Sequence, residues 1–253
     1  MNISGNTILV TGGGSGIGRG IAEALQKTGN EVVIAGRRQY ALEETTAANP
    51  GMNSLLLDIE NPVSIKALAK EVIAKFPAIN VLVNNAGIMR AEDLTADAID
   101  VARAESIVAT NLVGPIRLTA ALLPLLKKQP SATIINVSSG LAFVPLTLTP
   151  TYCATKAAIH SYTQSLRYQL RGSKVEVLEL IPPYVATDLM GGAEDPRAMP
   201  LVDFINETMA ILKQKPTPAE ICVDRVKPLR FAANEGHYAE VFQGLNAALA
   251  DVH

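Results

Sequence analysis

The sequence predicts an α/β fold: an open, doubly wound parallel sheet of about six or seven strands with helices on both faces. Two observations predict it. Short apolar runs typical of buried strands alternate with longer runs of helical periodicity between residues 7 and 181, and a glycine-rich turn joins the first strand to the first helix. The chain has 253 residues and no linker-like segment, so we expect one domain over residues 1–253 with a helical C-terminal tail.

The composition excludes several classes of function. There are 22 basic and 24 acidic residues, a formal net charge of −2, and no run of basic residues, so nucleic acids and anionic membranes are not expected partners. The N-terminus lacks a basic segment followed by an apolar one, and no apolar run reaches eighteen residues, so we expect a cytoplasmic protein. The two cysteines and three histidines have no metal-ligand spacing, and no metal site is expected.

The first predicted strand, Thr7–Val10, leads through the glycine-rich turn Thr11–Gly18 into a predicted helix over Arg19–Thr28. Glycine allows the backbone to approach a phosphate closely, and the first turn of a helix offers free N–H donors. A dinucleotide phosphate site is therefore predicted at this turn. Its spaced glycines, in the order G-x-x-x-G-x-G, are Gly12, Gly16 and Gly18.

The second predicted strand, Glu31–Ala35, ends in Gly36, Arg37 and Arg38 rather than in a carboxylate. An acidic residue there would bind the ribose 2′-hydroxyl of NAD, whereas arginine suits a 2′-phosphate through charge-assisted hydrogen bonds. NADP(H) is therefore favoured. NAD(H) remains the alternative, in which the two arginines face solvent at a helix start or stack on adenine.

The third predicted strand, Ser54–Leu57, ends at Asp58, whose carboxylate can accept a hydrogen bond from an adenine amino group. Pro62 suits the first position of the helix that follows, over Val63–Phe76.

The fourth predicted strand, Asn80–Val83, precedes Asn84–Gly87, where amide side chains can join neighbouring loops and small residues leave room for a cofactor. A long helical region over Ile99–Lys127 follows, with two prolines as expected kinks. Asparagine is not favoured inside a helix, so Asn111 is a candidate to hold a water or a backbone kink. The alternative is a buried asparagine with satisfied hydrogen bonds.

The fifth predicted strand, Ala132–Val137, is followed by Ser139, and a helix is predicted over Tyr152–Leu170. Tyr152 and Lys156 are four residues apart, so they share one face of that helix. A nearby cation favours the phenolate, which makes Tyr152 a candidate general acid/base, and a serine hydroxyl can stabilise a carbonyl oxygen that gains charge. The Tyr-x-x-x-Lys pair alone is more often amphipathic surface, so the interpretation depends on the other motifs.

An apolar loop at 141–148 separates Ser139 from this helix, and we interpret it as part of a substrate pocket, with a packed loop as the alternative. The sixth predicted strand, Lys174–Ile181, leads to a stiff turn that could present Val185 and Thr187 to a carboxamide. The Gly- and Pro-rich segment Met190–Pro200 is typical of a lid. Helical pieces are predicted over Leu201–Lys213, Ala219–Ala233 and Tyr238–Ala250. The residues assigned to the substrate pocket are Ile88, Met89, Leu141, Phe143, Val144, Tyr184 and Met190.

Taken in order, these motifs resemble the classical short-chain dehydrogenase/reductase (SDR) family over about residues 5–190. The resemblance is carried by T-G-G-G-S-G-I-G, Asp58, N-N-A-G, Asn111, V-S-S, Y-C-A-T-K and P-P-Y-V-A-T-D. It implies a Rossmann-type fold, a nicotinamide cofactor, and interconversion of a carbonyl and an alcohol.

The resemblance also implies a role for each site residue. Tyr152 would be the proton donor or acceptor and Ser139 the carbonyl binder. Lys156 would hold the nicotinamide ribose and lower the tyrosine pKa, and Asn111 would anchor a proton-relay water. The residues implied to bind the cofactor are Gly12, Ser15, Gly16, Ile17, Gly18, Arg37, Arg38, Asp58, Ile59, Asn85, Ala86, Gly87, Tyr152, Lys156, Val185 and Thr187.

The chain departs from the family pattern at three places. Pro183 stands where glycine is usual, and Ser15 stands where many NADP-type members carry a basic residue. The usual C-terminal strand is expected to be absent, as in a branch of oxidoreductases linked to D-alanylation operons. Without that strand the usual tetramer interface is in doubt, so a homodimer through the helices around Asn111 and Tyr152 is favoured.

The leading hypothesis is an NADP(H)-preferring carbonyl reductase or alcohol dehydrogenase acting on a hydrophobic ketone or aldehyde. One rival is a cofactor-binding redox sensor without turnover, against which the complete set of Ser139, Tyr152, Lys156 and Asn111 speaks. Another is an epimerase or dehydratase with tightly bound NAD, although such relatives usually carry a longer C-terminal substrate domain.

Overall fold

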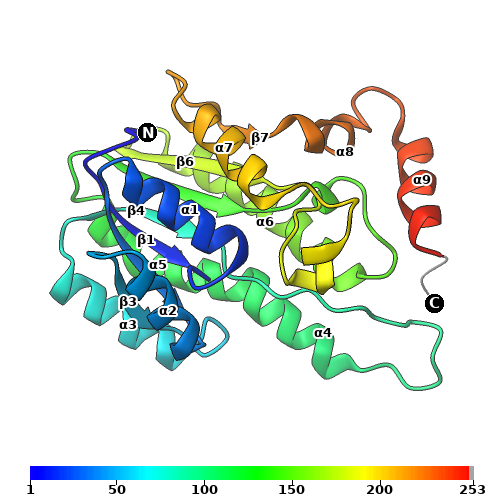
Figure 1. Cartoon of the computed structure of the whole chain (residues 1–253), viewed down its shortest axis with the longest axis horizontal. Coiled ribbons are helices and arrows are strands. Elements are labelled where there is room, and N and C mark those ends of the chain that lie inside the picture. Colours follow the sequence, from blue (N-terminus) through cyan, green and yellow to red (C-terminus); the bar gives the residue numbers. More distant parts are fainter. Residues whose placement is uncertain (251–253) are drawn as a thin grey trace.

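The computed structural model describes residues 1–250 and contains, within that range, one sheet of seven parallel strands in the order β3-β2-β1-β4-β5-β6-β7 (Figure 1). The predicted fold class is confirmed. The strand order reverses between β1 and β4, and ligands bind doubly wound sheets at such a switch point, beyond the carboxyl ends of the strands. The strands are β1 (Thr7–Thr11), β2 (Glu31–Gly36), β3 (Asn53–Leu56), β4 (Ile79–Asn84), β5 (Ala132–Val137), β6 (Val175–Ile181) and β7 (Glu220–Cys222).

Helices cover both faces of the sheet (Figure 1). Buried side chains of α1, α2 and α7 form one core with the sheet, and those of α3, α5 and α6 form the other. The helices are α1 (Gly16–Lys27), α2 (Gln39–Ala48), α3 (Pro62–Lys75), α4 (Val101–Val108), α5 (Gly114–Leu126), α6 (Pro150–Leu170), α7 (Leu201–Leu212), α8 (Lys227–Phe231) and α9 (Tyr238–Ala250).

The expected absence of a C-terminal strand is wrong, and so is the single helix expected over Ala219–Ala233. Glu220–Cys222 forms β7, which pairs in parallel with β6, and helix α8 starts only at Lys227. Ile221 is fully buried in the core, which a strand position beside β6 achieves and an isolated helix would not. The reason given above for doubting a tetramer is therefore removed.

The long helical region expected over Ile99–Lys127 is divided by a π-helical segment, Ala109–Val113. Pro115 follows this segment and has no N–H to donate to the carbonyl of Asn111 in an α-helix. Single π-helical turns are frequent at functional sites. Asn111 lies inside this segment, where the polypeptide departs from regular helix next to the expected site.

A buried row of polar side chains fixes α6 on the sheet. Asn84 at the end of β4 donates a 2.8 Å hydrogen bond to Oδ1 of Asn136 at the end of β5. Asn136 in turn donates at 2.9 Å to Oγ1 of Thr163 on α6. Buried amides need such partners, so these bonds set the position of α6 against the two strands.

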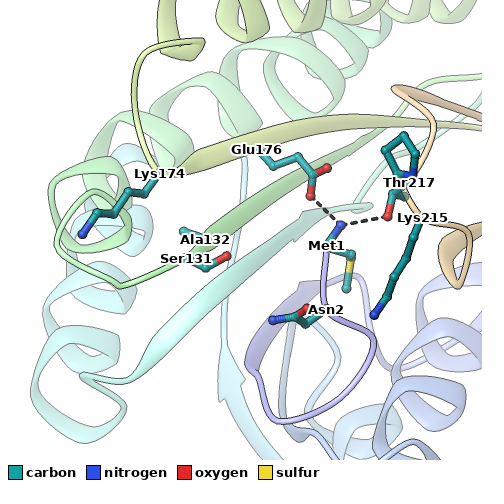
Figure 2. A pocket seen from close by; sticks show the side chains of 9 residues that line it. Met1, Asn2, Ser131, Ala132, Lys174, Glu176, Lys215 and Thr217 are labelled. Atoms are coloured by element: carbon teal, nitrogen blue, oxygen red, sulfur yellow. Dashed lines mark hydrogen bonds and ion pairs between the residues drawn. The ribbon is translucent and has the colours of Figure 1, made fainter.

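Two other features lie away from the carboxyl ends of the strands. A cavity of about 380 Å³ opens at the amino ends of β5 and β6, where the α-amino group of Met1 lies 2.7 Å from Glu176 and 2.8 Å from Oγ1 of Thr217 (Figure 2). In the described part of the chain, one helical stretch, Val101–Leu126, is long and apolar enough to cross a membrane by length and composition. Its Leu122 is fully buried in the core with α3, as in a core helix.

Candidate active site

Tyr152 and Ser139 meet at the carboxyl end of β5. Tyr152 lies in the first turn of α6 and is 7% exposed, and its hydroxyl faces the Ser139 side chain, which lowers the Tyr152 pKa. Ser139 is buried too, and its Oγ accepts a 3.1 Å hydrogen bond from the backbone N–H of Leu141. A carbonyl oxygen placed between the two hydroxyls would meet two hydrogen-bond donors.

Lys156 lies one helical turn after Tyr152, as the spacing predicts. Its Nζ donates a 2.9 Å hydrogen bond to the carbonyl of Val137 and lies 5.5 Å from the centre of the Tyr152 ring. The side chain is 5% exposed. This single backbone bond orients the ammonium group toward the end of β5 and leaves its other N–H donors for a ligand.

The pKa of Tyr152 is raised, not lowered as expected. Burial raises the pKa of Tyr152 to about 12, and the Ser139 side chain only partly opposes this rise. Burial also lowers the pKa of Lys156 to about 8. The spacing of Tyr152 and Lys156 indicates their mutual attraction but not their loss of solvation, which dominates because both side chains are almost fully buried.

Asn111 joins the loop after β4 to α6. Its Oδ1 accepts a 2.8 Å hydrogen bond from the N–H of Ile88, and its Nδ2 donates at 2.8 Å to the carbonyl of Ile88 and at 3.3 Å to Oγ1 of Thr155. Both N–H donors of the side chain are therefore used, and Oδ1 accepts one hydrogen bond of a possible two. The residue acts as a clamp at the site, and a water held by it would donate to Oδ1 or to the backbone carbonyl.

The glycine-rich turn packs directly against the N-N-A-G segment. Gly12 has a φ of 68°, and a Cβ there would lie 2.9 Å from Nδ2 of Asn85 and 3.0 Å from Cα of Ala86. A Cβ on Gly18 would overlap the carbonyl oxygen of Gly12 and Nδ2 of Asn85. The missing side chains thus allow the turn, the start of α1 and the N-N-A-G segment to pack in direct contact. Gly16, Ile17 and Gly87 lie on the same two segments, at the start of α1 and after Ala86.

Arg37 and Arg38 follow β2 and are both exposed. Nη2 of Arg38 donates a 2.7 Å hydrogen bond to Oγ of Ser15, so the second arginine and the glycine-rich turn lie together. Asp58 follows β3, with its Oδ1 accepting a 3.1 Å hydrogen bond from Glu60, and the next residue, Ile59, is buried.

Thr187 lies beside the glycine-rich turn as well, since a Cβ on Gly16 would lie 3.4 Å from the Thr187 side chain. Val185 is buried and forms an isolated parallel bridge with Met199. The segment after β6 is thereby placed over the start of α1, although Pro183 replaces the usual glycine. The residues predicted to bind the phosphates, the ribose and the carboxamide of the cofactor thus all follow the carboxyl ends of the strands.

The predicted pocket residues divide into groups. Ile88, Met89 and Leu141 belong to an apolar cluster around Tyr152. Phe143 packs instead against the ring of His160, with ring centres 4.7 Å apart, and Val144 is fully buried. On the segment after β6, Tyr184 is exposed and donates to Asp195 at 3.2 Å, and Met190, with a φ of 54°, is exposed.

Sequence reasoning missed several groups at the site. Thr11 ties the glycine-rich turn to the N-N-A-G segment, because its Oγ1 accepts from the N–H groups of Asn85 and Ala86, both at 3.0 Å. Helix α9 reaches the apolar cluster through Leu245, and its Asn246 binds the loop at 141–148. No local pattern marks these contacts, since they join segments far apart in the sequence.

Comparison with known proteins identifies the family of the chain. The short chain dehydrogenase family model matches residues 6–198. The uncharacterized oxidoreductase DltE of Bacillus subtilis is 37% identical over 251 residues, covering 97% of this chain and 98% of the relative.

Solved structures are similar over nearly the whole chain. A short chain dehydrogenase from Burkholderia cenocepacia in complex with NADP has a TM-score of 0.81 at 26% identity, covering 95% of this chain and 98% of that one. A 3-ketoacyl-(acyl-carrier-protein) reductase from Brucella melitensis complexed with NADH has a TM-score of 0.79 at 26% identity, covering 89% and 100%. The chain therefore belongs to the short-chain dehydrogenase family, in a branch similar to the oxidoreductase DltE.

Proposed function

We propose that this protein is an NAD(P)(H)-dependent oxidoreductase that interconverts a carbonyl and an alcohol, as a carbonyl reductase or alcohol dehydrogenase. The observation that carries the proposal is the buried Tyr152 hydroxyl, which faces Ser139, with the Lys156 ammonium one helical turn away. These groups follow the carboxyl end of β5, and the glycine-rich turn follows the carboxyl end of β1 in the same parallel sheet.

The residues of the chain would divide the chemistry among them. Ser139 donates a hydrogen bond to the carbonyl oxygen, and Tyr152 gives that oxygen a proton in reduction and removes one in oxidation. Lys156 binds the ribose hydroxyls with its remaining N–H donors and stabilises the phenolate by its charge. A bound nicotinamide supplies or accepts the hydride.

We propose that Asn111 takes part through its backbone carbonyl, while its side chain holds Ile88 and Thr155 in place. Pro115 cannot donate the α-helical hydrogen bond to the carbonyl of Asn111, so that carbonyl is a candidate acceptor for a water that carries protons to Lys156.

The chain fits a nicotinamide dinucleotide, and we propose that NADP(H) is preferred over NAD(H). The similar proteins were solved with NADP in one case and NADH in another. Here Arg37 and Arg38 follow β2, and Arg38 lies against Ser15 at the phosphate turn. Two guanidinium groups at this edge suit a ribose 2′-phosphate. Asp58 and Ile59 would flank the adenine, and Val185 and Thr187 the carboxamide.

The substrate is proposed to be a hydrophobic ketone or aldehyde. Met89 and Leu146 are buried around Tyr152, and Leu141 and Leu245 border the same cluster. An apolar wall beside the reacting hydroxyl gains little from a small polar substrate. Turnover of hydrophobic ketones should therefore exceed that of small polar ones, and the reverse order would contradict this assignment.

We further propose a cytoplasmic homodimer. An apolar groove of about 490 Å³ on the outer face of α4 and α5 includes Val108, Val113 and Thr151, close to Asn111 and Tyr152 in the sequence. A second copy of the chain would cover this face. A monomer by light scattering, or a dimer whose stability is unchanged by Val108→Glu, would contradict this interface.

The decisive experiment compares wild-type protein with Tyr152→Phe, using NADPH and NADH with a panel of hydrophobic carbonyls and alcohols. Loss of a general acid should lower turnover about 10²- to 10⁴-fold, while cofactor affinity measured by calorimetry stays within a few-fold. Cofactor binding without wild-type turnover would favour a redox sensor. Protein purified with tightly bound NAD would favour an epimerase or dehydratase.

A further inference from the structure

A fully buried carboxylate lies behind the proposed catalytic residues. Glu179, in the middle of β6, is 0% exposed. Its Oε1 accepts a 2.6 Å hydrogen bond from Oγ of Ser138, and Nδ1 of His160 lies 3.0 Å from Oε1 and 2.8 Å from Oε2. A carboxylate at this depth is costly unless it is paired and hydrogen-bonded, so its retention in the core needs a reason.

Both partners of Glu179 are neighbours of Lys156. Ser138 directly follows Val137, whose carbonyl binds Nζ of Lys156 at 2.9 Å. His160 comes four residues after Lys156, one turn along the same face of α6. Glu179 is thus bound to the residue that follows the carbonyl holding Lys156 and to a residue one helical turn from Lys156. Its charge opposes the lowering of the Lys156 pKa that burial causes.

Other charged groups around Glu179 come from the C-terminal segment. Glu220 on β7 is held by Arg230 on α8, with Nε and Nη2 at 2.7 and 3.0 Å from its two oxygens. Ligand-type atoms of His160, Glu179 and Glu220 lie within 4.8 Å of one another, a spacing that would suit a metal ion. Because Arg230 already neutralises Glu220 and Ser138 binds Glu179, we interpret the cluster as a hydrogen-bonded network.

We propose that Glu179 is a positioning residue for the reaction: held by Ser138 and His160, its carboxylate is the counter-charge that keeps the Lys156 ammonium protonated beside Tyr152. The inference rests on the proposed function in that Lys156 serves the reaction as a cation. The groups whose charge reaches this pocket are Tyr152, Lys156, His160, Glu179, Glu220, Cys222 and Arg230.

The test is a direct titration of Lys156 by NMR of protein labelled with ¹³C at the lysine ε-carbon, with the Lys156 signal identified by its loss in Lys156→Arg. In Glu179→Gln the midpoint of the Lys156 titration should fall by about one pH unit or more, because an opposite charge that acts on Lys156 has been removed. The matched control, Glu220→Gln, should shift the midpoint of the Lys156 titration less. An unchanged midpoint in a folded Glu179→Gln protein overturns the proposal.

Should Glu179→Gln fail to fold, the double variant Ser138→Ala/Glu179→Met removes the charge without leaving an unpaired buried hydroxyl. It should show the same downward displacement, and Glu179→Asp should restore the wild-type midpoint. With an active enzyme, the alkaline limb of kcat moves to lower pH in parallel. If the Lys156 midpoint is displaced in Glu179→Gln but the protein turns over no carbonyl, the counter-charge role of Glu179 stands and the proposed function is rejected. If the protein turns over carbonyls but the Lys156 midpoint is unchanged in Glu179→Gln, only the counter-charge role of Glu179 is rejected.

Discussion

Arg38 and Ser15 are in direct contact, with Nη2 of the arginine donating a 2.7 Å hydrogen bond to Oγ of the serine. The two residues come from different βα units, the end of β2 and the N-cap of α1. Serine at position 15 is a departure from the basic residue that the family resemblance led us to expect in an NADP-type chain. The contact brings a guanidinium group to the place where that basic residue would have stood.

Removing this guanidinium should reduce the preference for NADPH. In Arg38→Ala we expect NADPH to bind about tenfold more weakly, which corresponds to about 1.4 kcal/mol, with little change for NADH. Arg37→Ala, measured beside it, should show which arginine carries the larger share. Calorimetric titration of both cofactors measures the effect. If the variants bind NADPH and NADH equally more weakly, or if neither affinity changes, the preference for NADPH does not come from these residues. Both arginines would then face solvent or stack on the adenine.

The depressed Lys156 pKa predicts a stability that rises with pH. The pKa falls from 10.5 to about 8 on folding, so between these values the unfolded chain binds more protons than the folded one. The free energy of unfolding should therefore gain about 2 kcal/mol between pH 7.5 and 9.5 from this group. Urea unfolding of wild-type and Lys156→Met protein at both pH values isolates this contribution. If the free energy of unfolding changes equally with pH in the two proteins, burial does not depress the pKa of Lys156.

The unfolding experiment is kept below pH 10 because the ionisation of Tyr152 has the opposite effect on stability. Burial raises its pKa from 10.0 to about 12, so the folded protein keeps a proton that the unfolded chain releases, and stability falls above pH 10.

Gly18→Ala should damage the glycine-rich turn. The new methyl group would overlap the carbonyl of Gly12 and the amide of Asn85, an overpacking that costs about 1 to 3 kcal/mol. A lowered melting temperature and weaker binding of either nicotinamide cofactor are expected. Gly172→Ala is the control, since a Cβ there meets nothing within 4 Å. If the two variants behave alike, the close approach at Gly18 does not govern cofactor binding.

Asn246→Ala should loosen α9 from the apolar loop. Oδ1 of Asn246 accepts from the backbone N–H and the hydroxyl of Thr147 at 2.7 and 2.8 Å, and Nδ2 donates to Pro145 at 3.1 Å. Each hydrogen bond contributes about 0.5 to 1.5 kcal/mol, so KM for hydrophobic substrates should rise several-fold while cofactor affinity is retained. The exposed Gln243 on the same helix supplies the control variant Gln243→Ala. An unchanged KM would separate α9 from substrate binding.

Local features of the sequence predicted much of the fold. The strand predicted over Ala132–Val137 has the observed bounds, because a short apolar run that ends before turn residues favours a buried strand. The strand Glu220–Cys222 could not be predicted in the same way. It is three residues long, and it forms only because β6 offers a free edge, with Leu180 opposite Ile221.

The same distinction applies to the candidate site. Tyr152 and Lys156 are placed by helix geometry alone, so their spacing of four positions is enough to predict that they share one face of the helix. The contact of Arg38 with Ser15 and the position of Glu179 behind Lys156 depend on strand register and helix packing. The direction of the Tyr152 pKa depends on burial, which spacing does not reveal.

Helix α6 carries Tyr152, Lys156 and His160 on successive turns, and its distal end is tied down by Arg167, which donates to the carbonyls of Val177 at 2.8 Å and Ala219 at 3.0 Å. At 1.5 Å per residue, about 22 Å separate Tyr152 from that anchor. A helix of this length is stiff, so the hydrogen bonds of Arg167 and the packing of α6 on the sheet together fix the direction in which its first turn presents Tyr152. The segment before β7 therefore contributes to the orientation of the proposed proton donor.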